Sequence, residues 1–339
     1  MLRHLILGGV GYIGKHVAAE LSAAGEPVTI SGRRASPPPG LVESVSIGSP
    51  VEYREVDLVA ADWDRVLQDF DVVHHYAWST FPATANENPM GDFDVHVRGS
   101  LNLLEAARRA TGKRIVFLSS GGTVYGRHDQ PAREDDPLRP IGAYGAGKAT
   151  VETYLRVYHT AGWLDARVAR LSNPYGAGQD PARRQGAVNV FIHRALEFEP
   201  LEIWGDGQVV RDYIYIGDAA RGLAQFACAA LPVHDMPIVN FGSGHGASLN
   251  QIVELIEAHL SRPVAVERRA SRPYDVPSSV LNIERAALWL AWRPTVPFFE
   301  GIALTISDVA SRSLAAATDE HRALPTRSVH GTWINPTRE

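Results

Sequence analysis

Short apolar runs alternate with longer amphipathic segments along the first half of the chain. The runs are rich in Val, Ile and Leu and have the length of strands, at Leu5–Leu7, Val28–Ser31, Val51–Val56, Val72–His75, Ile115–Leu118 and Arg167–Leu171. Segments with apolar residues at helical spacing lie between them, at Asp62–Gln68, Asp94–Ala110 and Tyr144–Thr160. This alternation predicts an α/β fold with a parallel, doubly wound sheet.

The pattern changes after Asn173, where a second and smaller set of elements begins. Its helices and strands are expected at Val188–Glu197, Leu201–Trp204, Arg211–Ile216, Asp218–Ala230, Ile238–Phe241 and Leu249–Leu260. We predict a sheet domain over 1–173, a smaller C-terminal α/β lobe over 174–315 and a tail over 316–339. Helix Asp218–Ala230 is expected to return to the main sheet, within a segment near 212–240. The two elements after it are expected to complete the smaller lobe.

Composition excludes several classes of protein. The chain is 45% hydrophobic, but no apolar run approaches the roughly 20 residues that span a membrane. The net charge of −5, without a basic run, argues against a nucleic-acid partner. The single cysteine, Cys228, fits a reducing cytoplasm. The 13 histidines show no metal-ligand spacing, and the adjacent His74 and His75 would point to opposite faces of a strand, so no metal site is expected.

A glycine-rich turn follows the first predicted strand. Its sequence is Gly8-Gly9-Val10-Gly11-Tyr12-Ile13-Gly14, and a helical pattern follows it. A strand, a glycine turn and a helix in this order are typical of a dinucleotide-binding Rossmann domain, in which backbone approaches the pyrophosphate at a helix N-terminus. We therefore expect cofactor contacts from Gly8, Gly11, Tyr12, Ile13 and Gly14.

A tyrosine and a lysine stand four residues apart at Tyr144 and Lys148. Residues at this spacing share one face of a helix. The chain has only three lysines, Lys15, Lys113 and Lys148, among 33 basic residues, so Lys148 suggests a task for a compact ammonium that arginine cannot perform. The other interpretation is a surface Tyr and Lys at a common helical spacing.

Together these motifs resemble those of the extended short-chain dehydrogenase/reductases that act on nucleotide sugars, UDP-glucose 4-epimerases most of all. The resemblance covers roughly residues 2–310. It is carried by the glycine turn and by Asp57-Leu58, His75-Tyr76-Ala77, Ser119-Ser120-Gly121-Gly122-Thr123-Val124-Tyr125-Gly126, Tyr144…Lys148, Asn173-Pro174-Tyr175-Gly176, Arg211-Asp212-Tyr213, Arg272-Pro273-Tyr274-Asp275 and Leu290-Ala291-Trp292.

The resemblance implies roles for individual residues. Tyr144 would be the acid/base, and Lys148 would bind the nicotinamide ribose. Asp57 and Leu58 would flank the adenine. Further cofactor contacts are implied for Tyr76, Ala77, His96 and Ser119. Contacts with a nucleotide-diphosphate sugar are implied for Trp78, Ser79, Thr123, Asn173, Asn189, Arg211, Arg272 and Asp275, with Arg211 and Arg272 near the diphosphate. A homodimer is also implied, and it fits the apolar residues that Asp94–Ala110 and Tyr144–Thr160 carry on more than one face.

Three positions depart from the family pattern. Gly121 stands where the family has Ser or Thr, so the hydrogen-bond donor to the reacting oxygen must be Ser119, Ser120 or Thr123, and we favour Thr123. His96 replaces the usual Asn, and Trp78 replaces a small residue. Trp78 either narrows the sugar pocket or packs behind it. For Arg211, an ion pair with Asp212 or Asp218 is the alternative to phosphate binding.

The end of the second strand bears on the choice of cofactor. NAD-preferring members of the family have Asp or Glu there, whereas this chain has Gly32-Arg33-Arg34. Two guanidinium groups suit a 2′-phosphate, so we expect NADP(H) to be preferred, with NAD as the alternative. Arg33 and Arg34 as solvated loop residues are the other interpretation.

Three functions remain open on the sequence. The first is an NADPH-dependent reductase of a nucleotide-linked 4-keto sugar, which the two arginines favour. The second is an NAD-dependent nucleotide-sugar 4-epimerase, which the overall motif match favours. The third is a non-catalytic NADP-sensing protein, which needs no acid/base pair. A 4,6-dehydratase is disfavoured because the segment around Gly122 lacks an Asp-Glu pair.

Overall fold

A parallel sheet forms the centre of the larger domain. The computed structural model describes residues 1–180, 186–232, 234–271 and 276–322. In these residues the sheet has seven strands, in the spatial order β10 (Ile238–Phe241), β6 (Asp165–Leu171), β5 (Arg114–Ser120), β4 (Val72–His75), β1 (His4–Leu7), β2 (Val28–Gly32) and β3 (Val51–Glu55). The order reverses direction between β1 and β4, which confirms the predicted doubly wound α/β fold. In such sheets, ligands bind at the carboxyl edge beside this reversal.

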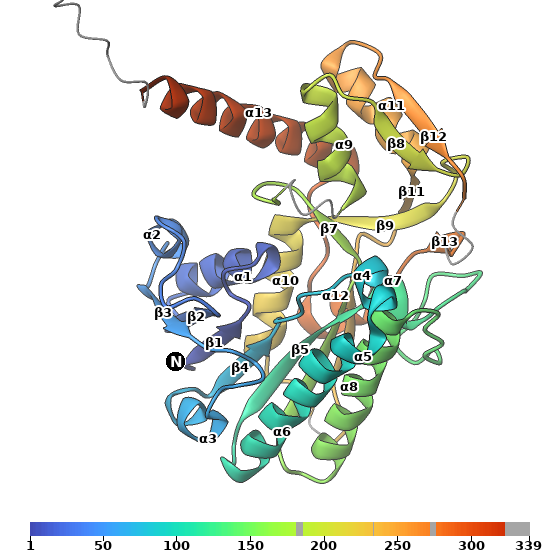
Figure 1. Cartoon of the computed structure of the whole chain (residues 1–339). Helices are drawn as coiled ribbons and strands as arrows, with labels where there is room; N and C mark the ends of the chain where they lie inside the picture. The colour runs from blue at the N-terminus through green and yellow to red at the C-terminus, as the bar shows by residue number, and fades with distance from the viewer. Residues whose placement is uncertain (181–185, 233, 272–275, 323–339) are drawn as a thin grey trace, which may run out of the picture.

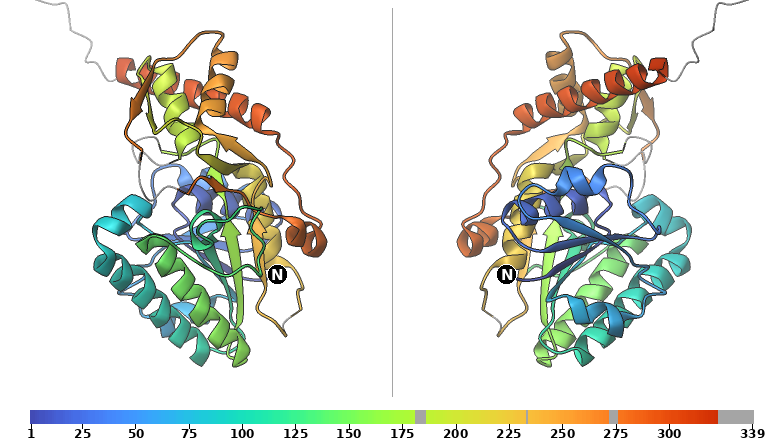
Figure 2. Two further views of the ribbon diagram at one scale, coloured as in Figure 1. Left: turned by 90° about the vertical axis from the view of Figure 1, so that its right-hand side faces the viewer. Right: turned by 90° about the vertical axis from the view of Figure 1, so that its left-hand side faces the viewer.

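Helices cover both faces of the sheet (Figure 1). One face carries α3 (Trp63–Val66), the 3₁₀ turn η1 (Leu67–Asp69), α6 (Gly99–Arg109) and α8 (Ala143–Thr160), and the other carries α1 (Tyr12–Ala23), α2 (Leu41–Val45), α10 (Ile216–Cys228) and α12 (Glu284–Leu290). Figure 2 shows the two layers edge-on. Strands β1 and β4 are buried along their whole length, including His4, His74 and His75, as expected for central strands of a sheet covered on both faces.

The returning segment extends further than predicted. Strand β10 pairs with β6 in the main sheet, so assigning Ile238–Phe241 to the smaller lobe was wrong. Helix α12 also packs on this domain, and the buried Trp292 that follows it donates from Nε1 to the carbonyl oxygen of Asp218 at 3.2 Å. These contacts join residues far apart in sequence, and a local hydrophobic pattern does not report them.

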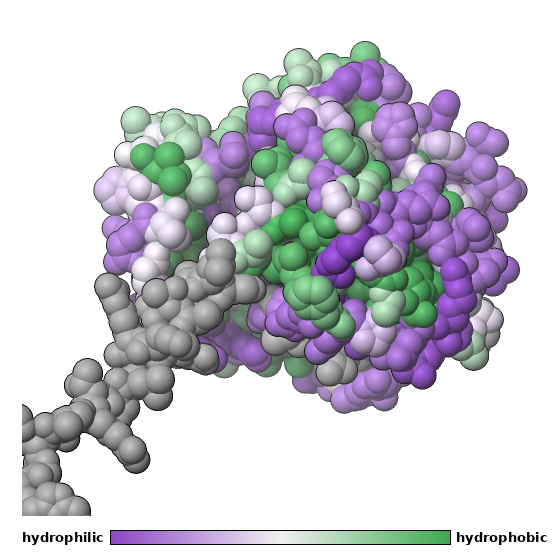
Figure 3. All heavy atoms as spheres, turned by 90° about the horizontal axis from the view of Figure 1, so that it is seen from above, coloured by the Kyte–Doolittle hydropathy of each residue, from purple (hydrophilic) through white to green (hydrophobic). Residues whose placement is uncertain are grey.

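The smaller lobe is built on short strands. These are β7 (Asn173–Tyr175), β8 (Leu201–Trp204), β9 (Val210–Tyr215), β11 (Gly246–Ser248), β12 (Val266–Arg269) and β13 (Ser278–Ser279), packed with α9 (Ala187–Leu196), α11 (Leu249–Leu260) and α13 (Phe298–Arg322). Helix α13 runs past residue 315, so the first part of the predicted tail is helical. From above, an apolar patch lies among polar residues (Figure 3). Among the described residues, no helix is both long and apolar enough to cross a membrane.

The segment before α6 is not one continuous helix. Short helices α4 (Pro82–Glu87) and α5 (Pro89–Asp92) lead into a π-helical turn, η2 (Phe93–Arg98), and only then into α6. The helix predicted over Asp94–Ala110 is therefore present, but its first turn is π-helical. Such π turns are frequent at functional sites, and this one carries His96.

Candidate active site at the carboxyl edge of the sheet

The glycine turn between β1 and α1 is packed so tightly that side chains at its glycines would contact neighbouring backbone atoms. Gly8 has φ of +81°, in the left-handed region. A side chain at residue 14 would place its Cβ 2.4 Å from the carbonyl oxygen of Gly8, and one at residue 8 would place it 3.1 Å from Ala77 Cα. The turn therefore leaves its backbone and the N-terminus of α1, which begins at Tyr12, open to a pyrophosphate. These residues fit a dinucleotide.

The residues expected around this turn have different surroundings. Ala77 is half-buried directly beside Gly8, and Ile13 is half-buried on α1. The Tyr76 side chain is buried in the core, with its hydroxyl 3.1 Å from His74 Nδ1, so only its backbone faces the turn. The Tyr12 hydroxyl is buried and has no hydrogen-bond partner in the described part of the chain.

The two arginines expected at the adenine end of a cofactor follow β2. Arg33 and Arg34 are exposed directly after β2. A side chain at residue 32 would place its Cβ 3.1 Å from Val10 Cγ2 and 3.2 Å from the Tyr53 hydroxyl, so a carboxylate there meets steric opposition. The Tyr53 hydroxyl donates to the carbonyl oxygen of Arg34 and shapes the loop.

The Asp57-Leu58 pair follows β3 at the same edge. Asp57 Oδ1 accepts hydrogen bonds from the amides of Val59 at 2.8 Å and Ala60 at 3.0 Å. Leu58 is buried against Gly99. The pair is thus held in a fixed turn beside the proposed adenine position.

Tyr144 and Lys148 lie on one face of α8, as their spacing predicts. The helix begins where Asn86 Oδ1 accepts from the amide of Ala143 at 2.8 Å, which satisfies one of its free N-terminal donors. Lys148 is 2% exposed and donates from Nζ to the carbonyl oxygen of Leu118 on β5 at 2.7 Å. Its Nζ lies 5.7 Å from the centre of the Tyr144 ring. Burial of Lys148 excludes the interpretation of a solvated surface lysine.

Burial controls the protonation of this pair. Desolvation raises the pKa of Tyr144, and the nearby Asp92 carboxylate raises it further, so the phenol holds its proton at neutral pH. Desolvation lowers the pKa of Lys148 to about 7, although Asp92 and Glu152 oppose this shift. Tyr144 is therefore poised as a proton donor, and the ammonium of Lys148 is present below about pH 7.

The space beside Gly121, where the family has Ser or Thr, is occupied by a side chain from far along the sequence. A Cβ at residue 121 would lie 2.5 Å from Leu281 Cδ1, so the Leu281 side chain would have to move to admit Ser or Thr there. Ser119 is buried and donates its hydroxyl to Glu152, while Ser120 is half-buried at the start of α7 (Gly121–Val124). Thr123 Oγ1 is buried and lacks a hydrogen-bond partner within the described residues. Thr123 therefore stays the predicted donor to a reacting oxygen, with the half-buried Ser120 as the alternative.

Trp78 and His96 are stacked on each other beside Tyr144. Their ring centres are 4.6 Å apart, with an interplanar angle of 11°. Lys148 Nζ lies 3.9 Å from the centre of the Trp78 ring, and the Trp78 and Tyr144 rings meet edge-on at 5.9 Å. His96 Nδ1 is 3.0 Å from Asp92 Oδ1, and His96 Nε2 accepts from the backbone amide of Ser79 at 2.9 Å. Both ring nitrogens of His96 are thus hydrogen-bonded to other residues of the chain.

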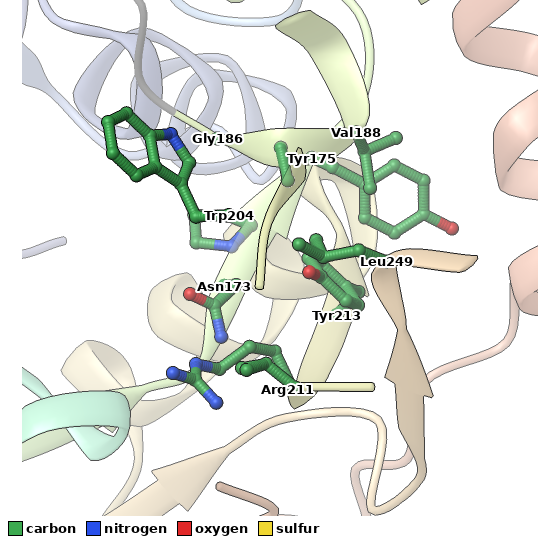
Figure 4. A pocket seen from close by; sticks show the side chains of 11 residues that line it. Asn173, Tyr175, Gly186, Val188, Trp204, Arg211, Tyr213 and Leu249 are labelled. Atoms are coloured by element: carbon green, nitrogen blue, oxygen red, sulfur yellow. The ribbon is translucent and has the colours of Figure 1, made fainter. Parts of the chain in front are cut away.

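A second part of the site is a cavity of about 240 Å³ between β7, β9 and α9. Asn173 and Arg211 extend along one side of it, and the Trp204 indole stands on another (Figure 4). Asn173 donates from Nδ2 to the carbonyl oxygen of Asp212, at 2.9 Å. Arg211 donates to the carbonyl oxygens of Val210 and Val276, at 2.8 and 2.6 Å. The size and mixed lining suit one end of a nucleotide sugar.

Close contacts connect this cavity to the acid/base. A Cβ at Gly122 would lie 3.9 Å from Asn173 Nδ2, and one at Gly145 would lie 2.7 Å from the carbonyl oxygen of Thr123. Thr123 and Gly122 therefore stand between Tyr144 and Asn173. A molecule bound along this line would touch the cavity at one end and Tyr144 at the other.

Other predicted substrate residues are placed differently. Asn189 is buried, and its side-chain amide makes two hydrogen bonds with the backbone of Gly176, at 2.8 and 3.1 Å, so it holds the loop after β7. Ser79 is exposed to solvent, and its hydroxyl lies 3.0 Å from His96 Nε2. Arg272 and Asp275 lie outside the described residues. Within the described ranges, no group of three or more His, Cys, Asp or Glu is arranged to hold a metal ion.

Sequence reasoning missed a buried ion pair beneath the site. Glu152, one turn after Lys148 on the same face of α8, pairs with Arg170 on β6 at 2.7 Å, and both side chains are nearly inaccessible to solvent. The spacing of Tyr144, Lys148 and Glu152 was the available signal. Asp92, which also acts on Tyr144, was missed too, because no local pattern marked it.

Comparison with known proteins decides the family. Residues 4–239 match the family model described as the NAD dependent epimerase/dehydratase family. The chain belongs to this family. This confirms the assignment to nucleotide-sugar-type enzymes of the extended short-chain class that was made from the motifs.

Three relatives illustrate the range of the family. The UDP-glucose 4-epimerase of Mycolicibacterium smegmatis is 32% identical over 92% of this chain and 100% of that protein. A dTDP-4-dehydro-6-deoxyglucose reductase of Escherichia coli is 31% identical over 90% of this chain and 96% of that protein. The crystal structure of Thermus thermophilus UDP-glucose 4-epimerase in complex with NAD has a TM-score of 0.82 and 32% identity, covering 91% of this chain and 99% of that one.

Replacing Tyr144 with Phe tests the acid/base. Only the phenolic hydroxyl is removed and the ring packing against Trp78 stays, so we expect kcat to fall by about 10²–10⁴. Cofactor and sugar-nucleotide affinities, measured by titration, should change little. A variant that keeps more than about a tenth of the wild-type kcat would exclude Tyr144 as the acid/base.

The pKa of Lys148 predicts a pH profile. Because burial lowers this pKa to about 7, the ammonium is lost as pH rises through that value, and kcat/KM should fall above it. Lys148→Arg keeps its charge at all these pH values, so the falling limb should disappear. Its activity should still be low, because a planar guanidinium does not replace a compact ammonium. A wild-type profile that stays flat to pH 9 contradicts this account.

Proposed function

We propose that the protein is an NADPH-dependent reductase that acts at C4 of a 4-keto sugar linked to a nucleoside diphosphate. The observation that carries this proposal is the line of groups along the carboxyl edge of the sheet. It runs from the glycine turn through Tyr144, Lys148 and Thr123 to the cavity at Asn173 and Arg211. The names of the epimerase and reductase relatives support a nucleotide-sugar substrate.

Each residue on this line has a task in the reaction. Bound NADPH would supply hydride to the carbonyl carbon and leave as NADP⁺. Tyr144, protonated because of its burial, gives its proton to the carbonyl oxygen. The unpartnered Thr123 hydroxyl donates a hydrogen bond to the same oxygen. The Lys148 ammonium stabilises the phenolate that Tyr144 becomes.

Both candidate reactions use Tyr144 to exchange a proton with the oxygen at C4, so its raised pKa does not distinguish them. The two arginines after β2 favour the reductase. The second candidate is an NAD-dependent 4-epimerase, which the names of several relatives and the NAD complex of the Thermus structure favour.

Cofactor choice is part of the proposal. The exposed Arg33 and Arg34, with Val10 and Tyr53 crowding the Cβ position at Gly32, suit the 2′-phosphate of NADPH. Hydrogen bonds to a charged group contribute roughly 1.5–3 kcal/mol each, enough for more than a tenfold preference.

A turnover assay tests function and cofactor together. Wild-type protein with dTDP-4-dehydro-6-deoxyglucose should oxidise NADPH with a kcat/KM at least about tenfold above that for NADH. Arg33→Ser with Arg34→Ser should lower only the NADPH value. Arg293→Ser, which removes an exposed arginine after α12, serves as the control.

The outcomes of this assay separate the two candidates. Conversion of UDP-glucose to UDP-galactose by tightly retained NAD, with no consumption of NADPH, would establish the epimerase instead. Equal kcat/KM for NADPH and NADH would show that Arg33 and Arg34 are solvated loop residues.

We also propose a homodimer formed through η2 and α8. Phe93 and Val95 on η2 and Tyr154 and Val157 on α8 are each more than 40% exposed although apolar or aromatic. Light scattering should give about twice the 36.9 kDa chain mass, and Val157→Lys should shift the protein toward monomer. A wild-type monomer at micromolar concentration would refute the dimer.

A further inference from the structure

Two of the positions that depart from the family pattern contact each other. Trp78 stands where a small residue is usual, and His96 stands where Asn is usual. Their rings stack with centres 4.6 Å apart and an interplanar angle of 11°. Because each departure packs against the other, we treat them as one feature, the Trp78–His96 stack.

The stack is held from several sides. Asp92, which is 4% exposed, accepts from Thr80 Oγ1 and lies 3.0 Å from His96 Nδ1. The backbone amide of Ser79 fixes the other ring nitrogen of His96, at 2.9 Å. The rim of the Trp78 indole approaches α8 so closely that a Cβ at Gly147 would lie 3.2 Å from Cζ2. The indole is therefore a rigid surface.

The Trp78 indole lies beside the acid/base pair, so it limits the space that is open to a sugar there. The Trp78 ring meets the Tyr144 ring at 5.9 Å and lies under Lys148 Nζ at 3.9 Å, so it borders the point where the sugar carbonyl must receive its proton. Trp78 is only half-buried, although its indole nitrogen is buried. An indole fills far more space there than a small side chain.

The free space beside the C4 carbonyl decides whether a bound keto sugar can rotate within the site. A 4-epimerase must present both faces of the C4 carbonyl in turn, so its sugar must move within the site. We propose that the Trp78–His96 stack is a wall of the sugar subsite that holds the sugar ring in one orientation, so that only one C4 configuration is formed. This inference rests on the proposed function and names the stereochemical control within it.

Binding without cofactor gives the first test. Isothermal titration of the cofactor-free protein with UDP-glucose and UDP-galactose, or with the corresponding thymidine pair if the uridine pair does not bind, compares two C4 epimers. Wild type should bind one epimer at least about tenfold more tightly, as a tight pocket discriminates small changes. Trp78→Ala with His96→Asn, which restores the usual residue types, should reduce this ratio to about two or less.

Product analysis gives the second test. With NADPH and dTDP-4-dehydro-6-deoxyglucose, wild type should give one C4 epimer by NMR, and the double variant should give both. Trp78→Phe, a milder change for the case that the double variant does not fold, should give an intermediate ratio. Trp163→Ala removes an indole beyond the far end of α8 and should change neither ratio.

The possible results are distinguishable. If wild type binds both epimers equally or makes both products, the wall does not exist. If the folded variants keep the wild-type ratios, Trp78 merely packs behind the site, and the inference is overturned while the reductase stands. If wild type consumes no NADPH with the keto sugar, the proposed function fails and the inference falls with it. Interconversion of UDP-glucose and UDP-galactose by wild type would overturn both.

Discussion

The buried ion pair between Glu152 and Arg170 is the interaction on which the site depends. Arg170 on β6 holds both carboxylate oxygens of Glu152, and Ser119 on β5 donates to the same carboxylate. The pair thus ties one face of α8 to two central strands. Breaking a buried pair by removing one partner typically costs about 3–5 kcal/mol, because the other charge is left without compensation. Because the pair fixes α8 against the sheet, it also fixes Tyr144 and Lys148, which lie on the same face of the helix.

Tyr144 and Lys148 gain their chemistry from the same placement. Both side chains lie on the α8 face that Glu152 fixes, and Lys148 reaches the carbonyl oxygen of Leu118 near the carboxyl end of β5. Burial there raises the pKa of the Tyr144 phenol and lowers that of the Lys148 ammonium. Asp92, held by His96, adds a negative charge nearby. Position in the fold therefore keeps the proton on Tyr144 that the proposed reduction needs, while it makes the Lys148 ammonium easier to deprotonate.

The sequence predicted the elements well where the pattern was local. The runs Val72–His75 and Leu201–Trp204 coincide with β4 and β8, and the glycine turn and the Tyr-Lys spacing lie where they were expected. The argument from scarce lysine was only partly right. All three lysines donate to a backbone carbonyl at 2.7 Å, Lys15 to Gly178, Lys113 to Phe70 and Lys148 to Leu118, so a compact ammonium also serves structural ends in this chain.

Features made by distant contacts could not be predicted. Leu281 closes the space at Gly121, β10 joins the main sheet, and the π turn aims His96 at Trp78. None of these has a signature within a few residues of sequence, because each depends on which segments the fold brings together. The stacking of two unusual residues is of this kind, since the sequence marked both departures without showing that they touch.

Isotope transfer tests the central claim most directly. NADPH carrying deuterium at both C4 positions of the nicotinamide, supplied with dTDP-4-dehydro-6-deoxyglucose, should yield a sugar nucleotide with one deuterium, located at sugar C4 by NMR. This result would show that hydride passes from the cofactor to the carbon beside Tyr144 in a net reduction. A keto sugar that takes up no deuterium, together with conversion of UDP-glucose to UDP-galactose by the same protein, would contradict the reductase and support the epimerase.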